Sequence, residues 1–198
     1  MRDLSLHILD LIENSLRASA TTVAVGLLAD ARRDVLKVVI EDNGPGLPVA
    51  AHEATDPFFT TKEGKRTGLG LSLFKATAER AGGTLELRKS GLGGLAVEAR
   101  MQLSHVDRCP IGDLAATLCS IVCMNPQLDL RLDIDCSGHR VRLNVQDVAR
   151  DMGAGVVANA ATTAPRMVQN VDGLALANRV GELLREKLPQ DGSHSVLA

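Results

Sequence analysis

Asp56-Pro57-Phe58-Phe59-Thr60-Thr61-Lys62 is followed, four residues later, by Thr67-Gly68-Leu69-Gly70-Leu71, and this stretch determines the fold that the sequence predicts. Two shorter segments precede it: Glu13-Asn14-Ser15 on a predicted helix, and Asp42-Asn43-Gly44-Pro45-Gly46 at the end of a predicted strand. The chain has three Phe, no Trp and no Tyr, and all three Phe lie in or beside these segments. In this order the segments predict a pocket for a nucleotide and its metal ion.

The composition is that of a soluble globular protein. The chain has 198 residues, of which 45% are hydrophobic and 23% charged, enough for one large or two small domains. A net charge of -2 gives no electrostatic reason to expect nucleic acid or an anionic membrane as a partner. No apolar run approaches the ~20 residues that span a bilayer. Because Met1-Arg2-Asp3 leads directly into an amphipathic segment instead of a signal peptide, we expect a cytoplasmic protein.

The first half of the chain predicts helices that cover a mixed sheet. Leu9, Ile12 and Leu16 give residues 4–18 a helical period. A second helix is predicted over 69–81, and strands are predicted over 21–28, 35–40, 84–89 and 94–103, with a long loop over 43–68. The expected fold class is α+β, as a two-layer α/β sandwich.

The pattern restarts near residue 105. Helices are predicted over 112–124 and 172–188, and a hairpin is predicted with strands over 128–135 and 140–146. We therefore predict a first domain over residues 1–104 and a small C-terminal α+β extension over 105–198, which either docks a partner or enlarges the first domain. The extension holds all the cysteines, which we expect to be buried and unreactive: Cys109, Cys119, Cys123 and Cys136.

Asp10 and Asn14 share one side of the first predicted helix because they are four residues apart. A carboxylate beside an amide oxygen suits Mg²⁺, which binds few protein oxygens together with phosphate oxygens. His7 and Arg17 lie on the same polar stripe. Taken alone, this stripe fits the solvent-facing side of an ordinary amphipathic helix better than a metal site.

The turn after the second predicted strand is more informative. The Asp42 carboxylate can accept a hydrogen bond from an exocyclic amine such as that of adenine. Gly44 and Gly46 allow the backbone to approach a flat ring closely. An ordinary β-turn would need only Asn43-Gly44, and the second glycine makes that alternative weaker.

The glycines before the second predicted helix indicate an anion site. Thr67-Gly68-Leu69-Gly70 offers bare backbone N–H groups at the positive end of a helix dipole. Lys62, Lys65 and Arg66 add positive charge beside them.

These segments resemble the motifs of the GHKL superfamily, whose Bergerat-type ATP-binding fold is shared by gyrase, the heat-shock chaperone, histidine kinases and mismatch-repair proteins. Asp10–Asn14 resembles the N box, Asp42–Gly46 the first glycine box, Pro57–Lys62 the F box and Gly68–Gly70 the second glycine box. The F box and the second glycine box look most like those of sensor histidine kinases, whereas Glu13–Thr21 is closer to mismatch-repair ATPases. The resemblance covers about residues 4–103.

The resemblance implies ATP and Mg²⁺ as ligands, with roles for particular residues. Asn14 would hold the metal ion, and Asp42 would bind the adenine amine above a floor shaped by Gly44 and Gly46. Phe58 and Phe59 would pack a lid, Lys62 would reach the phosphates, and Gly68 and Gly70 would cradle them together with Thr67 and Leu69. Asp10 occupies the place of the carboxylate that activates water in ATP-hydrolysing members, a place commonly held by Asn in histidine kinases.

Two function classes follow from the resemblance. Only nine residues precede Asp10, which leaves no room for the phosphoacceptor hairpin of a sensor kinase, and we expect the five histidines to be solvated. We therefore predict a small stand-alone regulatory kinase that phosphorylates a partner protein in trans. The alternative is an ATP-dependent switch or clamp with slow hydrolysis and no phosphotransfer. Dimers are common across the superfamily, so a homodimer is compatible with either class.

Overall fold

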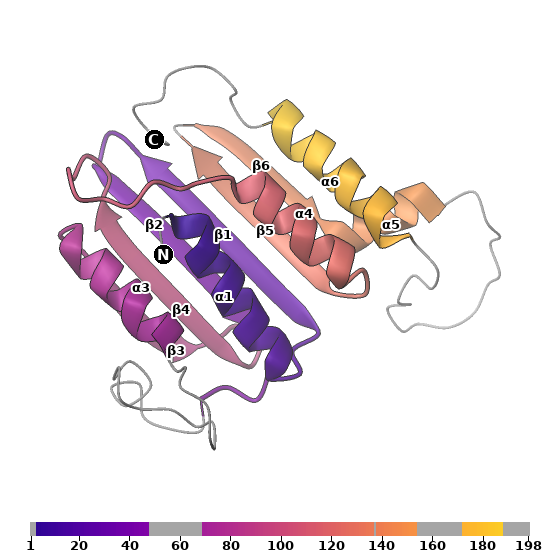
Figure 1. Cartoon of the computed structure of the whole chain (residues 1–198), viewed down its shortest axis with the longest axis horizontal. Coiled ribbons are helices and arrows are strands. Elements are labelled where there is room, and N and C mark those ends of the chain that lie inside the picture. The colour runs from indigo at the N-terminus through magenta and orange to yellow at the C-terminus, as the bar shows by residue number, and fades with distance from the viewer. Residues whose placement is uncertain (1–2, 48–68, 137, 154–171, 188–198) are drawn as a thin grey trace.

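Six strands form one sheet in the computed structural model, in the order β3-β4-β2-β1-β5-β6 (Figure 1). The structure describes residues 3–47, 69–136, 138–153 and 172–187. Neighbouring strands are antiparallel except β1 and β5, which pair in parallel. The strands are β1 (Thr22–Asp30), β2 (Val35–Asp42), β3 (Thr84–Lys89), β4 (Leu95–Gln102), β5 (Asp129–Cys136) and β6 (His139–Asn144).

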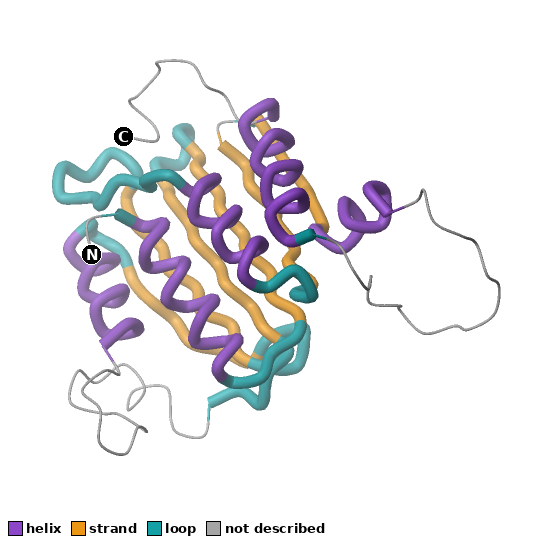
Figure 2. Tube along the Cα trace, turned by 45° about the vertical axis from the view of Figure 1, so that its right-hand side comes forward, coloured by secondary structure: helices purple, strands orange, loops and turns teal. Residues whose placement is uncertain are grey.

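Helices cover one face of this sheet. Figures 1 and 2 show α1, α3, α4 and α6 on the same side of the strands from two angles. Buried and partly exposed residues alternate along β1, β2 and β5 because one face of the sheet lies under these helices. This arrangement confirms the predicted two-layer α/β sandwich. The described helices are α1 (Leu4–Arg17), α3 (Leu69–Arg80), α4 (Leu114–Met124), α5 (Val145–Gly153) and α6 (Gly173–Lys187), and none of them is long and apolar enough to cross a bilayer.

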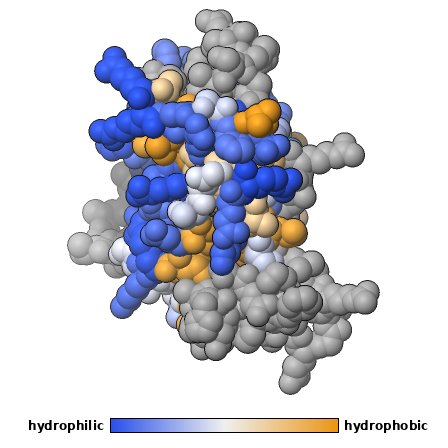
Figure 3. Space-filling view, turned by 90° about the vertical axis from the view of Figure 1, so that its left-hand side faces the viewer, coloured by the Kyte–Doolittle hydropathy of each residue, from blue (hydrophilic) through white to orange (hydrophobic). Residues whose placement is uncertain are grey.

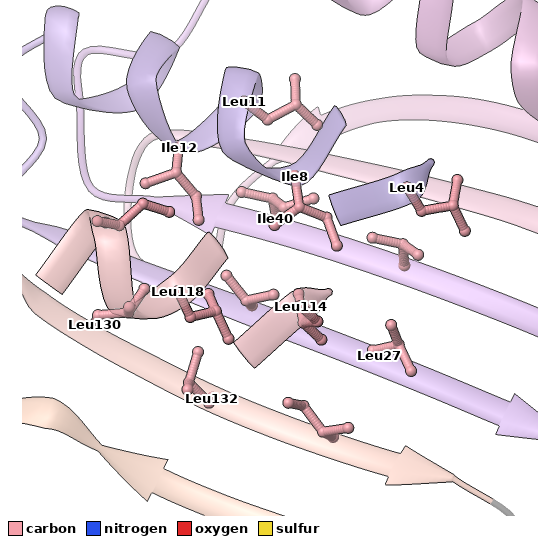
Figure 4. Packing of buried hydrophobic residues seen from close by; sticks show 14 of the residues in the cluster. Leu4, Ile8, Leu11, Ile12, Leu27, Ile40, Leu114, Leu118, Leu130 and Leu132 are labelled. Carbon is pink, nitrogen blue, oxygen red and sulfur yellow. The ribbon is translucent and has the colours of Figure 1, made fainter. Parts of the chain in front are cut away.

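One apolar core fills the space between the helices and the sheet (Figure 4). It contains residues from both halves of the chain, so the packing continues across residue 104. The division into a first domain and an extension remains a prediction. The residues labelled in Figure 4 come from α1 (Leu4, Ile8, Leu11, Ile12), α4 (Leu114, Leu118) and the strands (Leu27, Ile40, Leu130, Leu132).

The prediction of a strand through Gln146 is wrong. β6 ends at Asn144, and α5 begins at Val145. The Asn144 Oδ1 accepts a hydrogen bond from the Gln146 backbone N–H at 2.8 Å, which satisfies a free donor of the first helical turn. The alternation of apolar and polar residues continues into this helix, and for that reason it resembled a strand.

The buried side of α1 also differs from the predicted stripe. Leu9 and Leu16 are only partly buried, whereas His7, which was expected to be solvated, is 2% exposed. The reason is that α1 packs against α3 as well as against the sheet. The fully buried apolar face is formed by Leu4, Ile8, Leu11 and Ile12.

The thiols are less uniformly buried than expected. Cys136 is buried, and burial raises the pKa of its thiol to about 11. Cys109 and Cys119 are partly buried. Cys123, near the end of α4, is exposed, so the expectation of burial is wrong for this residue.

The β3 edge of the sheet is charged. Glu86, Arg88 and Lys89 are exposed on this outermost strand. Figure 3 views the molecule from the side of α3 and β3 and shows mostly hydrophilic residues with smaller hydrophobic areas between them. Charged edge strands resist pairing with the strands of another molecule.

Candidate functional site

The helix α1 brings Asp10 and Asn14 together as predicted. Asp3 caps the helix, because its Oδ1 accepts a hydrogen bond from the Leu6 backbone N–H at 3.1 Å. One turn apart on the same side, the Asn14 Nδ2 donates to the Asp10 Oδ2 at 3.4 Å. The structure therefore contains the carboxylate–amide pair that the sequence predicted.

The start of α3 lies directly against this pair. A Cβ atom at Gly70 would stand 1.7 Å from the Asp10 Oδ2 and 3.5 Å from the Asn14 Nδ2, so a larger residue there would require the Asp10 side chain to move. Leu69 is the first residue of α3. The first N–H groups of a helix have no partner within it, and they are suited to bind an anion. The other predicted phosphate-binding and lid residues lie outside the described residues: Phe58, Phe59, Lys62, Thr67 and Gly68.

Asp42, the last residue of β2, is buried and accepts three hydrogen bonds. Its Oδ1 accepts from the Gly44 N–H at 2.9 Å and the Leu95 N–H at 3.1 Å, and its Oδ2 accepts from the Ser15 hydroxyl at 2.8 Å. An ionised carboxylate accepts about four hydrogen bonds, so the Oδ2 retains capacity for an amine of a ligand. Ser15 was not predicted, although it follows Asn14 directly.

The turn after Asp42 is held by its own side chains. The Asn43 Oδ1 accepts hydrogen bonds from the Thr21 and Thr22 N–H groups, both at 2.9 Å, which ties the turn to the start of β1. Gly46 has a φ of 78°, a left-handed conformation that favours glycine.

Two further glycines allow the backbone to close around the Asp42 carboxylate. A Cβ atom at Gly44 would lie 3.2 Å from the Asp42 Oδ1, and one at Gly94 would lie 2.1 Å from the same atom. The sequence predicted a role for Gly44 but placed Gly94 only at the start of a strand. Its contact depends on the pairing of β4 with β2, which the local sequence does not reveal.

Arg17 binds the same side chains as the predicted metal ion. Its guanidinium donates a hydrogen bond to the Asn14 Oδ1. It lies 4.0 Å from the Asp10 Oδ1 and 3.8 Å from the Glu13 Oε2. The oxygens of this side of α1 therefore already attract a positive charge.

These residues fit a Mg²⁺ ion that shares its coordination with phosphate. Asn14 supplies an amide oxygen, the Asp10 carboxylate beside it adds negative charge, and the Arg17 guanidinium shows that a cation is accommodated there. Within the described ranges, no group of three or more His, Cys, Asp or Glu side chains could hold a metal ion. An ion at this place would need phosphate and water oxygens, as is usual for Mg²⁺ bound with a nucleotide.

His7 is the buried titratable group nearest in sequence to this pair. Burial lowers the pKa of its imidazole to about 4, and the carboxylates of Asp10 and Asp3 only partly offset that effect. The imidazole is therefore neutral at pH 7.

One cavity lies near the candidate site, and a second lies on the sheet face that the helices leave open. One of about 420 Å³ adjoins the turn after Asp42 and is lined in part by Arg88 and Lys89. A larger one of about 550 Å³ lies over β1, β2, β5 and β6 on the face away from α1. Asp10, Asn14 and Asp42 line neither cavity, so the candidate site is identified by its side-chain chemistry.

The sequence matches a protein-family model over residues 2–105, slightly more than half of the chain. That family is described as "Histidine kinase-, DNA gyrase B-, and HSP90-like ATPase". The matched residues contain Asp10 and Asn14 of α1, together with Asp42 and Gly70, which lie against neighbouring residues of that helix. The match supports ATP binding and a kinase-like role for this half of the chain.

Curated relatives match over shorter stretches. The chain is 43% identical over 56 residues to the sensor protein CitS of Halalkalibacterium halodurans, covering 28% of this chain and 10% of the relative. It is 45% identical over 60 residues to the two-component sensor PprA of Pseudomonas aeruginosa, covering 29% and 6%. It is 35% identical over 91 residues to the sensor protein kinase PilS of the same organism, covering 43% and 17%. The chain thus spans less than a fifth of the length of each of these relatives.

Among solved structures, the ATP-binding domain of PrrB from Mycobacterium tuberculosis is similar with a TM-score of 0.38 and 29% identity, covering 49% of this chain and 64% of that chain. The ATPase domain of Aquifex aeolicus MutL, complexed with ADP, is similar with a TM-score of 0.36 and 14% identity, covering 72% and 64%.

Proposed function

This chain belongs to the family of histidine kinase-, DNA gyrase B- and HSP90-like ATPases, and on that premise we propose that it binds Mg-ATP and phosphorylates a partner protein. One observation carries the proposal. Two consecutive residues of α1 contact the two proposed parts of the nucleotide site. Asn14 pairs with Asp10 against the start of α3, and Ser15 donates a hydrogen bond to the buried Asp42. A single helix thereby joins a cation-binding pair to a hydrogen-bond acceptor for a base.

In this proposal the described residues bind the two ends of the nucleotide. The Asp42 Oδ2 accepts a hydrogen bond from the adenine amine, beside a turn shaped by Gly44 and Gly46. Asn14 holds Mg²⁺, and the start of α3 at Gly70 donates N–H groups to phosphate. The bound Mg²⁺ would neutralise charge on the phosphates. The proposed site also includes Phe58, Lys62, Thr67, Gly68 and Leu69.

Asp10 is the candidate general base of the transfer. A hydroxyl oxygen or ring nitrogen of the partner attacks the γ-phosphorus and forms a new bond to it. The bond from the γ-phosphorus to the bridging oxygen breaks, and ADP leaves with that electron pair. The proton of the attacking group passes to the Asp10 carboxylate. The partner is a protein substrate in the cytoplasm, and a homodimer is compatible with this scheme.

The carboxylate at position 10 also favours a second candidate, an ATP-dependent switch or clamp. If water replaces the partner's nucleophile, the same proton transfer to Asp10 yields slow hydrolysis without phosphotransfer. ATP binding is common to both candidates.

Incubation with γ-labelled ATP and Mg²⁺, alone and with a cell lysate, separates the candidates. Label on a protein other than this chain supports the kinase. Released inorganic phosphate without labelled protein supports the switch, and retention of all label in ATP contradicts both. Asp10→Ala should leave ATP affinity within about twofold and reduce turnover by at least about 100-fold, the usual contribution of a general base. Asp30→Ala, which changes a carboxylate at the far end of β1, is the control and should leave turnover unchanged.

A further inference from the structure

His7 lies in the core between α1 and α3, where a polar ring is costly. The residue is 2% exposed, and its Nδ1 has no hydrogen-bond partner among the described residues. An apolar residue of similar size would avoid the cost of an unpaired buried nitrogen. This position on α1 is one turn before Asp10.

The imidazole makes two specific contacts, both with α3. Its ring stacks on Phe74 with centroids 5.0 Å apart and planes inclined by 20°. Its Nε2 lies 3.2 Å from the Thr77 Oγ1, and that hydroxyl donates its hydrogen to the Leu73 carbonyl oxygen at 2.9 Å. A hydroxyl has one hydrogen, so the His7 Nε2 is the donor to Thr77 and the Nδ1 is the unprotonated nitrogen.

The same two helix faces meet again at the candidate site. On α1, His7 shares its side with Asp10 and Asn14, three and seven residues further along. On α3, Thr77 and Phe74 lie on the same side of the helix as Gly70, which precedes them by seven and four residues. The two helices run in opposite directions along this contact, with His7 at one end and the Asp10–Gly70 contact at the other.

The two helices also approach closely at the far end of the contact. A Cβ atom at Gly70 would overlap the Asp10 Oδ2, so the backbone of α3 lies directly against the Asp10 side chain. A rotation or shift of α3 at Phe74 and Thr77 would change where its first N–H groups stand relative to Asn14. Displacements of about 1 Å are large on the scale of site geometry.

We propose that His7 is a positioning residue: its hydrogen bond to Thr77 and its stacking on Phe74 fix the distance and rotation of α3 against α1, and thereby place the start of α3 beside Asp10 and Asn14 for ATP. This inference rests on the proposed nucleotide site. It gives a buried polar residue of the core a role in nucleotide affinity.

The test measures Mg-ATP affinity by titration calorimetry at a temperature well below unfolding. Thr77→Val removes the hydroxyl with little change of shape, and His7→Leu removes the ring. Each should weaken Mg-ATP binding by about fivefold, the scale of one lost hydrogen bond. The double variant should bind no more weakly than His7→Leu alone, because both changes remove the same bond. His7→Gln keeps an Nε2 donor but loses the stacking on Phe74, so it should weaken Mg-ATP binding by less than His7→Leu does.

Leu176→Ala is the matched control, because it removes a fully buried side chain of α6 away from α1 and α3. It should lower the unfolding temperature without changing Mg-ATP affinity. Unchanged affinity in Thr77→Val, or additive losses in the double variant, would overturn the positioning role while ATP binding itself stands. Absence of binding by the unsubstituted chain would overturn both proposals. If His7→Leu does not fold, Thr77→Val alone decides the outcome.

Discussion

Asp42 is a buried carboxylate whose contacts with the described residues leave acceptor capacity on one oxygen. Its Oδ1 accepts from the N–H groups of Gly44 and Leu95, whereas among the described residues its Oδ2 accepts only from Ser15. An amide at this position can keep the Oδ1 contacts, since it still has one acceptor oxygen. It cannot accept a hydrogen bond from an amine on its nitrogen.

Asp42→Asn should therefore fold normally and lose ATP affinity. Loss of a charged, buried acceptor costs about 2–4 kcal/mol, which corresponds to a fall of about 30- to 1000-fold in affinity. Fluorescence titration with a labelled ATP analogue measures this loss. Asp30→Asn is the control, and normal ATP binding by Asp42→Asn would refute the assignment of the base-binding place.

His7 makes the stability of the fold depend on pH. Burial lowers its pKa to about 4 in the folded chain, below the ordinary value of 6.5. Between these pH values the unfolded chain binds more protons than the folded chain. The contribution of the neutral His7 to stability is therefore fully present above about pH 6.5 and is lost as the pH falls toward 4. This loss in the free energy of unfolding amounts to about 3 kcal/mol, at about 1.36 kcal/mol per pKa unit.

Urea unfolding at pH 7, 6 and 5 tests this dependence against His7→Gln, which keeps Asp3 and Asp10 but has no titrating ring. The unsubstituted chain should lose more stability than the variant over this range. Parallel losses in the two chains would show that other groups cause the acid sensitivity.

At the scale of elements, α1 depends on a segment that is distant in sequence. Its first free N–H groups, those of Leu4 and Ser5, donate to the carbonyl oxygens of Pro110 and Ile111 at 2.9 and 2.8 Å. The segment between β4 and α4 therefore caps the helix that carries Asp10 and Asn14. Gly112 continues this segment with a φ of 76°, and a Cβ atom there would lie 2.5 Å from the Asp3 Cγ.

Gly112→Ala should destabilise the chain and weaken ATP binding, because it strains the backbone and displaces the cap of α1. We expect a loss of about 1–3 kcal/mol in unfolding free energy. Gly138→Ala is a matched control, since its φ of 93° is equally left-handed but nothing lies within 4 Å of an added Cβ. The control should lose stability through strain alone and keep its ATP affinity. Equal effects of both substitutions on ATP affinity would argue against coupling through the cap.

Most elements could be predicted from periodicity, and each failure has a physical cause. Leu9, Ile12 and Leu16 predicted α1 as a helix but not its buried side, because packing against α3 adds His7 to the interior. Asn144 is a recognisable helix cap. The alternation of apolar and polar residues along β6 continues past it, and this continuation predicted a longer strand. Periodicity responds to burial on one face and gives poor results where a helix is covered on two.

At the scale of the whole molecule, the halves of the chain share one sheet and one core. β5 lies parallel to β1 along Thr22–Ala29, and Leu118 of α4 and Leu130 of β5 are fully buried in the same cluster as Ile8 and Ile12 of α1. The cap of α1 at Pro110 and Ile111 adds a polar link between the halves.

A fragment ending at residue 104 should consequently fold poorly. It would expose one edge of β1 and a side of α1, and it would lack the α1 cap. We expect its stability to fall by more than about 5 kcal/mol, comparable with the whole stability of a small domain. Urea unfolding and sedimentation compare the fragment with the full chain. An equally stable, monomeric fragment would support the predicted first domain as an independent unit.

The residues of the candidate site that belong to short sequence motifs could be predicted. The residues whose contacts depend on packing between distant elements could not. Asp10, Asn14, Asp42 and Gly70 follow from short motifs. Ser15, Gly94 and the Thr77 hydroxyl gain their roles only when α1, β4 and α3 are assembled. Their partners lie 27 to 70 residues away along the chain, beyond the reach of any local pattern.

The carbonyl cap of α1 has a consequence for synthesis of the chain. The helix carrying Asp10 and Asn14 is translated before Pro110 and Ile111, which follow about 100 residues later. At about 5–20 residues per second, the N-terminus of that helix waits roughly 5 to 20 s for its partners. The helix that carries the proposed nucleotide site is therefore translated well before the segment that caps it.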